Sequence, residues 1–243
     1  MITHGIASLR RMLRQSLARR LRLPEIPVAL KRLDRQGFNP ELIFDVGAYR
    51  GDFARLCRTI WPAARVACFE PQKSILPELR QYALETPHTE VFEYLLGAEV
   101  NPRVTFYEAS TASSVLLENV GPIHPTATYE MRTLQSVIES DTNRAPDLLK
   151  LDVQGYELEV LKGTSGYLSD IQVILIELNL LDIHDGVPLM DEVIAWLADR
   201  GWVAFDICGL TRRPLDDALW QADFLFVPVG SVLRRDKRWK VER

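Results

Sequence analysis

Residues 42–52 read Leu-Ile-Phe-Asp-Val-Gly-Ala-Tyr-Arg-Gly-Asp, and this stretch decides the fold. Five residues suited to a buried strand run directly into a glycine-containing turn, and a helix is predicted from position 52 to position 61. Gly47 lets the backbone come close to a ligand because it has no Cβ, and Gly51 allows close packing where the helix begins. Strand, glycine turn and helix in this order predict the first unit of a Rossmann-like α/β fold.

The alternation of strand and helix continues through the chain. Apolar, β-branched segments predict strands over residues 42–46, 65–69, 91–96, 103–108, 148–153, 173–178, 203–207 and 224–229. Helical spacing predicts helices over residues 52–61, 74–84, 134–139 and 189–200, the last closed by Gly201. Because parallel strands need crossover connections, this order predicts an α/β protein with a mostly parallel sheet and helices on both faces. A ligand should bind beyond the carboxyl ends of the strands.

Acidic residues at the ends of the first two strands indicate what the ligand is. Asp45 stands beside the glycine turn, where a carboxylate would repel a pyrophosphate but would suit the ammonium group of a methionine moiety, directly or through water. Glu70, in Phe69-Glu70-Pro71, lies 19 residues past Gly51, where an acid can accept both hydroxyls of a ribose. Either motif alone has a purely structural alternative. Together they predict a cofactor with a ribose and a cation and without a pyrophosphate.

A third motif, residues 147–163, places charge in an apolar strand. Lys150 and Asp152 share one side of the predicted strand by its period of two, and Glu177 lies near the end of the next strand. A lysine in such a strand needs a partner, because an unpaired buried charge is costly. The three side chains are therefore expected to converge at neighbouring strand ends. Both a catalytic role and a structural ion pair remain open for Lys150.

These motifs resemble the FkbM family of S-adenosylmethionine-dependent methyltransferases. The resemblance covers about residues 41–229 and rests on residues 44–48 with Gly51, 69–71, 113–114, 149–157, 161–163, Glu177 and 221–227. It implies a class I methyltransferase sheet of seven strands, S-adenosyl-L-methionine as cofactor, and O-methylation of a hydroxyl on a sugar, glycolipid or natural product. The cofactor-binding residues it implies are Asp45, Gly47, Ala48, Tyr49, Gly51, Glu70, Pro71 and Asp152. Tyr49 stands where the family usually has asparagine.

Methyl transfer to oxygen requires that the donor and acceptor are held in line and that the hydroxyl proton is removed. We expect Asp152 to act as the base or to orient the acceptor, with Lys150 tuning its charge and Glu177 as the second candidate. A divalent metal held by Asp152, Glu177 and His184 is a weaker alternative, because their spacing matches no known ligand signature. No metal is therefore predicted.

Two other functions compete with methyl transfer. A nicotinamide-dependent oxidoreductase shares the fold, but Asp45 and the lack of a G-x-G-x-x-G turn disfavour it. A catalytically inactive cofactor-binding module is the third hypothesis. The net charge of −4 gives no general reason to expect nucleic acid as a partner.

The two ends of the chain differ from its middle in composition. Residues 1–40 are predicted to form a basic helical appendage, with six arginines between positions 10 and 22 beside an apolar stripe, and with Pro24 and Pro27 ending its first helix. We favour packing of that helix on the domain over contact with an anionic membrane. Residues 41–230 form the predicted methyltransferase domain, and residues 231–243 a basic tail.

The cysteines and the hydropathy of the sequence indicate in which cellular compartment the protein is expected. Cys57, Cys68 and Cys208 suit the core of a reduced intracellular protein better than a disulfide framework. No apolar run approaches the roughly 20 residues of a membrane span. A cytoplasmic protein is expected, with membrane association of the basic helix as the alternative and the oligomeric state open.

Overall fold

The computed structural model describes residues 21, 23–108, 113–119 and 125–240. The helix predicted over residues 1–23, with its membrane alternative, therefore lies almost wholly outside the described residues. Within the described ranges, no helix is both long enough and apolar enough to cross a membrane.

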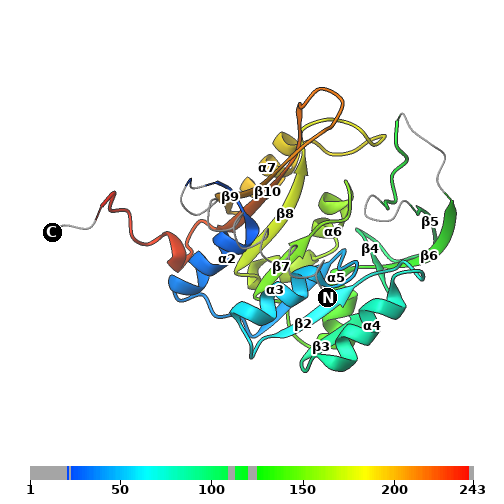
Figure 1. The fold of residues 1–243 in the computed structure, drawn as a ribbon, viewed down its shortest axis with the longest axis horizontal. Coiled ribbons are helices and arrows are strands. Elements are labelled where there is room, and N and C mark those ends of the chain that lie inside the picture. The colour runs from blue at the N-terminus through cyan, green and yellow to red at the C-terminus, as the bar shows by residue number, and fades with distance from the viewer. Residues whose placement is uncertain (1–20, 22, 109–112, 120–124, 241–243) are drawn as a thin grey trace, which may run out of the picture.

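A seven-stranded sheet forms the centre of the molecule (Figure 1). Its strands, in spatial order, are β3 (Thr89–Phe92), β2 (Arg65–Phe69), β1 (Leu42–Val46), β7 (Leu148–Leu151), β8 (Val173–Asn179), β10 (Leu219–Pro228) and β9 (Trp202–Arg212). Neighbouring strands from β3 to β8 are parallel, and β10 runs antiparallel to both β8 and β9. The predicted α/β class and the mostly parallel seven-stranded sheet are confirmed.

Two hydrophobic cores, one on each face, hold helices against this sheet. The helices are α2 (Ile26–Arg35), α3 (Asp52–Ile60), α4 (Leu76–Glu85), α5 (Leu134–Val137), α6 (Glu157–Lys162) and α7 (Met190–Ala198). Buried residues of α2, α3 and α4 join one core, and those of α5, α6 and α7 join the other. Alternate residues of β1 supply both cores, with Ile43 in the first and Phe44 in the second, as the strand period of two requires. The three cysteines are free and buried, as expected.

A second, three-stranded sheet lies beside the carboxyl ends of the central strands. It consists of β4 (Leu95–Leu96), β6 (Thr126–Arg132) and β5 (Asn101–Tyr107) in that order. The single strand predicted over residues 91–96 is thus wrong, because its two halves belong to different sheets. β6 was not predicted. Its signal is the alternation of buried Tyr129 and Met131 with exposed polar neighbours.

The second proline of the amino-terminal region begins a helix instead of ending one. Pro27 lies in the first turn of α2, where its missing N–H costs no hydrogen bond. Leu30 and Leu33 are fully buried in the core shared with the sheet. This part of the predicted appendage therefore packs as part of the same core.

Candidate active site

A cavity of about 470 Å³ opens at the carboxyl ends of the central parallel strands. Its walls come from the turns after β1, β2 and β7, from the end of β8, from the three-stranded sheet and from the start of α2. Among the residues that line it are Ile26, Gly47, Ala48, Tyr49, Glu70, Pro71, Leu95, Phe106, Ser113, Lys150, Asp152, Gln154 and Glu177. Its size and mixed polar and apolar lining are typical of a site for a small organic molecule.

The glycine turn after β1 brings the backbone against the end of β7. Gly47 has a φ of +75°, and a Cβ there would lie 1.8 Å from the carbonyl oxygen of Asp152. The N–H groups of Gly47 and Ala48 both donate to the carbonyl of Phe69, at 3.1 Å. Only glycine allows this approach, and the neighbour that requires it is the protein's own backbone. The predicted approach of a ligand to Gly47 stays a prediction.

Glu70 lies at one end of the cavity, and backbone donors hold its carboxylate. One oxygen accepts from the N–H of Tyr49 at 2.8 Å, and the other accepts from the N–H of Gln72 at 2.9 Å. Burial raises the pKa of Glu70, and these two hydrogen bonds partly offset that effect. Because each carboxylate oxygen can accept more than one hydrogen bond, both oxygens keep capacity for the hydroxyls of a ribose.

Asp45 lies behind the cavity wall rather than on it. Its side chain is 0% exposed, and its carboxylate lies 3.1 Å from the ammonium of Lys150. In the sheet register, Asp45 of β1 stands directly beside Lys150 of β7. The expected direct contact between Asp45 and a ligand's ammonium is therefore not supported by the placement of this side chain.

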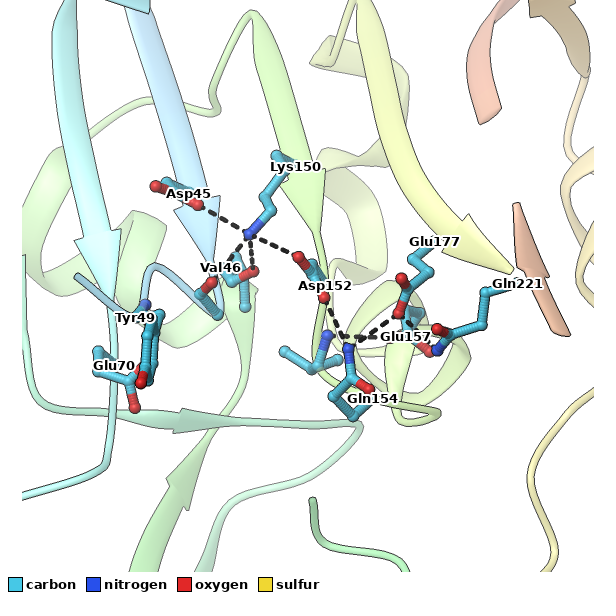
Figure 2. Close-up of polar contacts among 12 residues, drawn as sticks. Asp45, Val46, Tyr49, Glu70, Lys150, Asp152, Gln154, Glu157, Glu177 and Gln221 are labelled. Carbon is cyan, nitrogen blue, oxygen red and sulfur yellow. Dashed lines mark hydrogen bonds and ion pairs between the residues drawn. The ribbon is translucent and has the colours of Figure 1, made fainter. Parts of the chain in front are cut away.

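Lys150 directs its ammonium group at protein atoms of the glycine turn and the strand ends. Besides Asp45, Nζ contacts the carbonyl oxygen of Gly47 at 2.8 Å and a carboxylate oxygen of Asp152 at 3.4 Å (Figure 2). Burial alone would lower the pKa of Lys150, but the carboxylates of Asp45 and Asp152 outweigh burial and raise it. These contacts account for the three N–H groups of a charged ammonium. Lys150 therefore ties β1, its glycine turn and β7 together.

A chain of side-chain amides and carboxylates continues from Asp152 across the strand ends (Figure 2). The amide of Gln154 donates to Asp152 at 3.0 Å and to Oε1 of Glu177 at 2.9 Å. Gln221 of β10 donates to the same Oε1 at 2.7 Å. The expected convergence of Lys150, Asp152 and Glu177 is thus present, and Gln154 provides the link to Glu177.

Glu177 combines burial with surrounding negative charge. Burial raises its pKa well above the ordinary value, and Asp152, Glu157 and Asp223 raise it further. Both amide donors reach Oε1, so Oε2 has no hydrogen-bond partner among the described residues. Since Glu177 lines the cavity, this oxygen is available to a bound molecule.

Sequence reasoning assigned no role to Gln154, Glu157 or Gln221. Glu157 is buried and accepts from the N–H groups of Val153 and Gly155, which holds the loop that carries Gln154. Gln154 has a positive φ of 53°, so this loop needs such support. The signal for these residues lies in the quoted blocks 149–157 and 221–227, where Gln154 and Glu157 follow the buried strand β7 and Gln221 lies near the start of β10.

The alternative of a metal site has no support among the residues that the structure describes. No three His, Cys, Asp or Glu side chains there lie close enough together to hold a metal ion. His184 is buried and does not line the cavity that contains Asp152 and Glu177.

The sheet and its cavity define a Rossmann-like α/β domain with a site for a small organic molecule. The sequence pattern of the methyltransferase FkbM domain matches residues 45–203, about two thirds of the chain. The chain belongs to this family, as its motifs predicted.

One similar relative is the hexuronic acid methyltransferase AglP of Haloferax volcanii. The two sequences are 27% identical over 158 residues, which span 63% of this chain and 62% of AglP. The match therefore covers less than two thirds of the relative's length.

Two solved structures are similar in fold. Magnesium protoporphyrin IX methyltransferase from Synechocystis PCC 6803, solved with bound SAM, has a TM-score of 0.48 and 13% identity, over 83% of this chain and 76% of that one. Precorrin-6y C5,15-methyltransferase from Geobacter metallireducens has a TM-score of 0.46 and 11% identity, over 82% of this chain and 86% of that one.

S-adenosylmethionine is the cofactor that this family implies, and the residues present suit it. The turn of Gly47, Ala48 and Tyr49 lines the cavity, and Glu70 keeps free acceptor capacity for a ribose. Phe69, Leu95 and Phe106 give apolar surface for a flat base within the same cavity.

Proposed function

We propose that this protein transfers the methyl group of S-adenosylmethionine to a hydroxyl group of a sugar or glycan. The observation that carries the proposal is the polarity of one cavity, which has Glu70 at one end and the pair Asp152 and Glu177 at the other. Family membership supports the reaction class. The relative that acts on a hexuronic acid supports a sugar as acceptor.

In this proposal the cofactor is held by the first half of the cavity. Glu70 accepts the ribose hydroxyls, and the turn of Gly47, Ala48 and Tyr49 packs against the methionine portion. When bound, S-adenosylmethionine supplies a methyl group on a positively charged sulfur. The carboxylates of Asp152 and Glu177 favour that positive charge near the strand ends.

The remaining task of the chain is to take the acceptor's proton. The oxygen–methyl bond forms as the sulfur–methyl bond breaks, and the hydroxyl proton passes to a carboxylate. Asp152 was the first candidate, but its two oxygens face Lys150 and Gln154. Glu177 has a free oxygen in the cavity, and its raised pKa makes its carboxylate a stronger base than an ordinary glutamate. We therefore assign the base to Glu177 and the orientation of the acceptor to Asp152.

The experiment that tests the reaction combines binding with transfer of label. S-adenosylhomocysteine should bind in calorimetry and NAD should not, and a radiolabelled methyl donor should label a sugar-containing acceptor from a cell extract. Binding of NAD alone would favour the oxidoreductase hypothesis. Binding of S-adenosylhomocysteine without any labelled product would favour the inactive module.

The assignment of the base is tested with matched amide variants. Glu177→Gln should lower turnover by about 10²–10⁴-fold with S-adenosylhomocysteine affinity unchanged, while Asp152→Asn keeps more activity. Turnover of the unchanged protein should rise with pH as the carboxyl of Glu177 ionises, because its pKa is raised, and Glu177→Gln should remove that rise. Full turnover by Glu177→Gln would contradict the assignment.

A further inference from the structure

Residues 229–240, which follow β10, place apolar side chains and cations together on the surface. Val229, Val232 and Trp239 are 56%, 66% and 97% exposed, which leaves almost the whole indole of Trp239 in water. A tryptophan in water is unusual in a folded domain, because its ring supplies large apolar area when it is buried. The exposed ring indicates a surface that meets something other than water.

The same segment is strongly basic. Its cations are Arg234, Arg235, Lys237, Arg238 and Lys240, and its one acid is Asp236. Asp236 pairs with Arg238 inside the segment, at 2.6 Å. The segment carries a net charge of +4, and since the whole chain carries −4, the rest of the chain carries −8.

The start of this segment is fixed to the folded body. Ser231 caps a short 3-10 helix, Val232–Arg234, by accepting from the N–H of Leu233 at 3.3 Å. Leu233 packs against the core that also contains Leu30 of α2, and Arg234 donates to the carbonyl of Val229 at 2.8 Å. The chain then runs away from the body beside α2 (Figure 1).

We propose that residues 229–240 form a docking site for an anionic lipid surface, with Trp239 at the level of the headgroups. Tryptophan concentrates at this depth of a bilayer because one edge of its ring is polar and the rest is apolar. Basic residues next to it gain from the negative potential of such a surface, by about fivefold in affinity for each Lys or Arg. The proposal does not depend on the methyl-transfer reaction.

The exposed valines favour lipid over nucleic acid as the partner. Contacts to a phosphate backbone come from cations and polar groups, and aliphatic side chains add nothing to them. An interfacial segment, in contrast, gains from every apolar side chain that leaves water.

The test is flotation of the full chain with vesicles. One set contains phosphatidylcholine alone, and the other contains phosphatidylcholine with about one third phosphatidylglycerol. The protein should bind the second set and not the first, and binding should weaken as salt rises, because exposed charges are screened. Trp239→Ala should weaken binding about tenfold, and Arg235→Gln with Lys237→Gln about 25-fold.

A matched variant separates this segment from the rest of the surface. Leu215→Ala removes another strongly exposed apolar side chain, 83% exposed in the turn between β9 and β10, and should leave vesicle binding unchanged. S-adenosylhomocysteine affinity should be the same in all variants and serves as the control for folding. Equal binding to both vesicle sets, no binding to either, binding that Trp239→Ala leaves unchanged, or preference for a single-stranded RNA over vesicles would each overturn the proposal.

Discussion

The two ends of the cavity are built in different ways. At the Glu70 end, backbone groups shape the site, because the turn of Gly47 packs on the carbonyl of Asp152 and N–H groups of Tyr49 and Gln72 hold the carboxylate. At the Glu177 end, side chains from three separate strands and a loop hold one another.

This difference affects how each end tolerates change. A backbone-built site depends on a few positions where only one residue type fits. A site built from linked side chains distributes its stability over several partners, so the loss of one leaves another charge or amide unsatisfied. The predictions that follow test this contrast, beginning with the largest expected effect.

Loss of the central cation should cost the most. Lys150→Met leaves the fully buried carboxylate of Asp45 without its partner, which should lower the free energy of unfolding by about 3–5 kcal/mol. Urea denaturation measures the change. Adding Asp45→Asn should recover at least about 2 kcal/mol, because the unpaired charge is then gone. Strictly additive losses in the double variant would show that the two residues are not coupled.

The backbone-built end should depend on the absence of one Cβ. Gly47→Ala should lower the free energy of unfolding by about 3 kcal/mol, because the new Cβ overlaps the carbonyl oxygen of Asp152. Gly186→Ala is the matched control, since Gly186 also has a positive φ, +68°, but nothing within 4 Å of the new Cβ. Its cost should be about 1 kcal/mol. Equal costs at both positions would mean that close packing at Gly47 is unimportant.

Recognition of the ribose should depend on Glu70 as an acceptor. Glu70→Gln replaces one carboxylate oxygen with an NH₂ group that faces a backbone N–H donor and cannot accept from a hydroxyl. Affinity for S-adenosylhomocysteine should fall about 100-fold in calorimetry, the loss of one strong charge-assisted hydrogen bond. Glu90→Gln, at an exposed position of β3, should leave the affinity unchanged. If Glu70→Gln binds S-adenosylhomocysteine with undiminished affinity, Glu70 is not the residue that binds the ribose.

A substitution of Glu157, which holds the loop that carries Gln154, should have the smallest effect on stability, and that effect should depend on pH. Burial raises the pKa of Glu157 to about 7 from the ordinary 4.5, against the hydrogen bonds from Val153 and Gly155. Between these values the folded state binds more protons than the unfolded state, so this group destabilises the fold progressively as pH rises. The stability of Glu157→Gln relative to the unchanged protein should therefore improve by about 2 kcal/mol from pH 4.5 to pH 7.5. Parallel stability curves would contradict this account.

The contrast between the two ends also explains what the sequence could predict. β1 and β2 were predicted with their observed bounds, and short local motifs were enough to single out Gly47 and Glu70, which both line the cavity. Local sequence patterns suffice at the Glu70 end because the strand and the turn that follows it are adjacent in the sequence. Gln154 and Gln221 could not be assigned, because their shared contact with Glu177 depends on how distant strands pair.

Asp45 is a residue for which the sequence suggested a ligand contact that its placement in the structure does not support. Its position beside the glycine turn suggested contact with a ligand, but the register of β1 with β7 places its carboxylate against Lys150. A period of two orders the side chains within each strand, but only the pairing of β1 with β7 shows that Asp45 and Lys150 meet behind the cavity wall. β6 was missed for another reason, since its short alternation of buried and exposed residues is weak evidence without a known partner strand.

A crystal structure with bound S-adenosylhomocysteine is the most direct test of the central claim. The account predicts both ribose hydroxyls within about 2.6–3.2 Å of the carboxylate of Glu70, and the sulfur directed toward Asp152 and Glu177. A molecule of S-adenosylhomocysteine bound outside this cavity, or bound inside it with its ribose away from Glu70, would contradict the account.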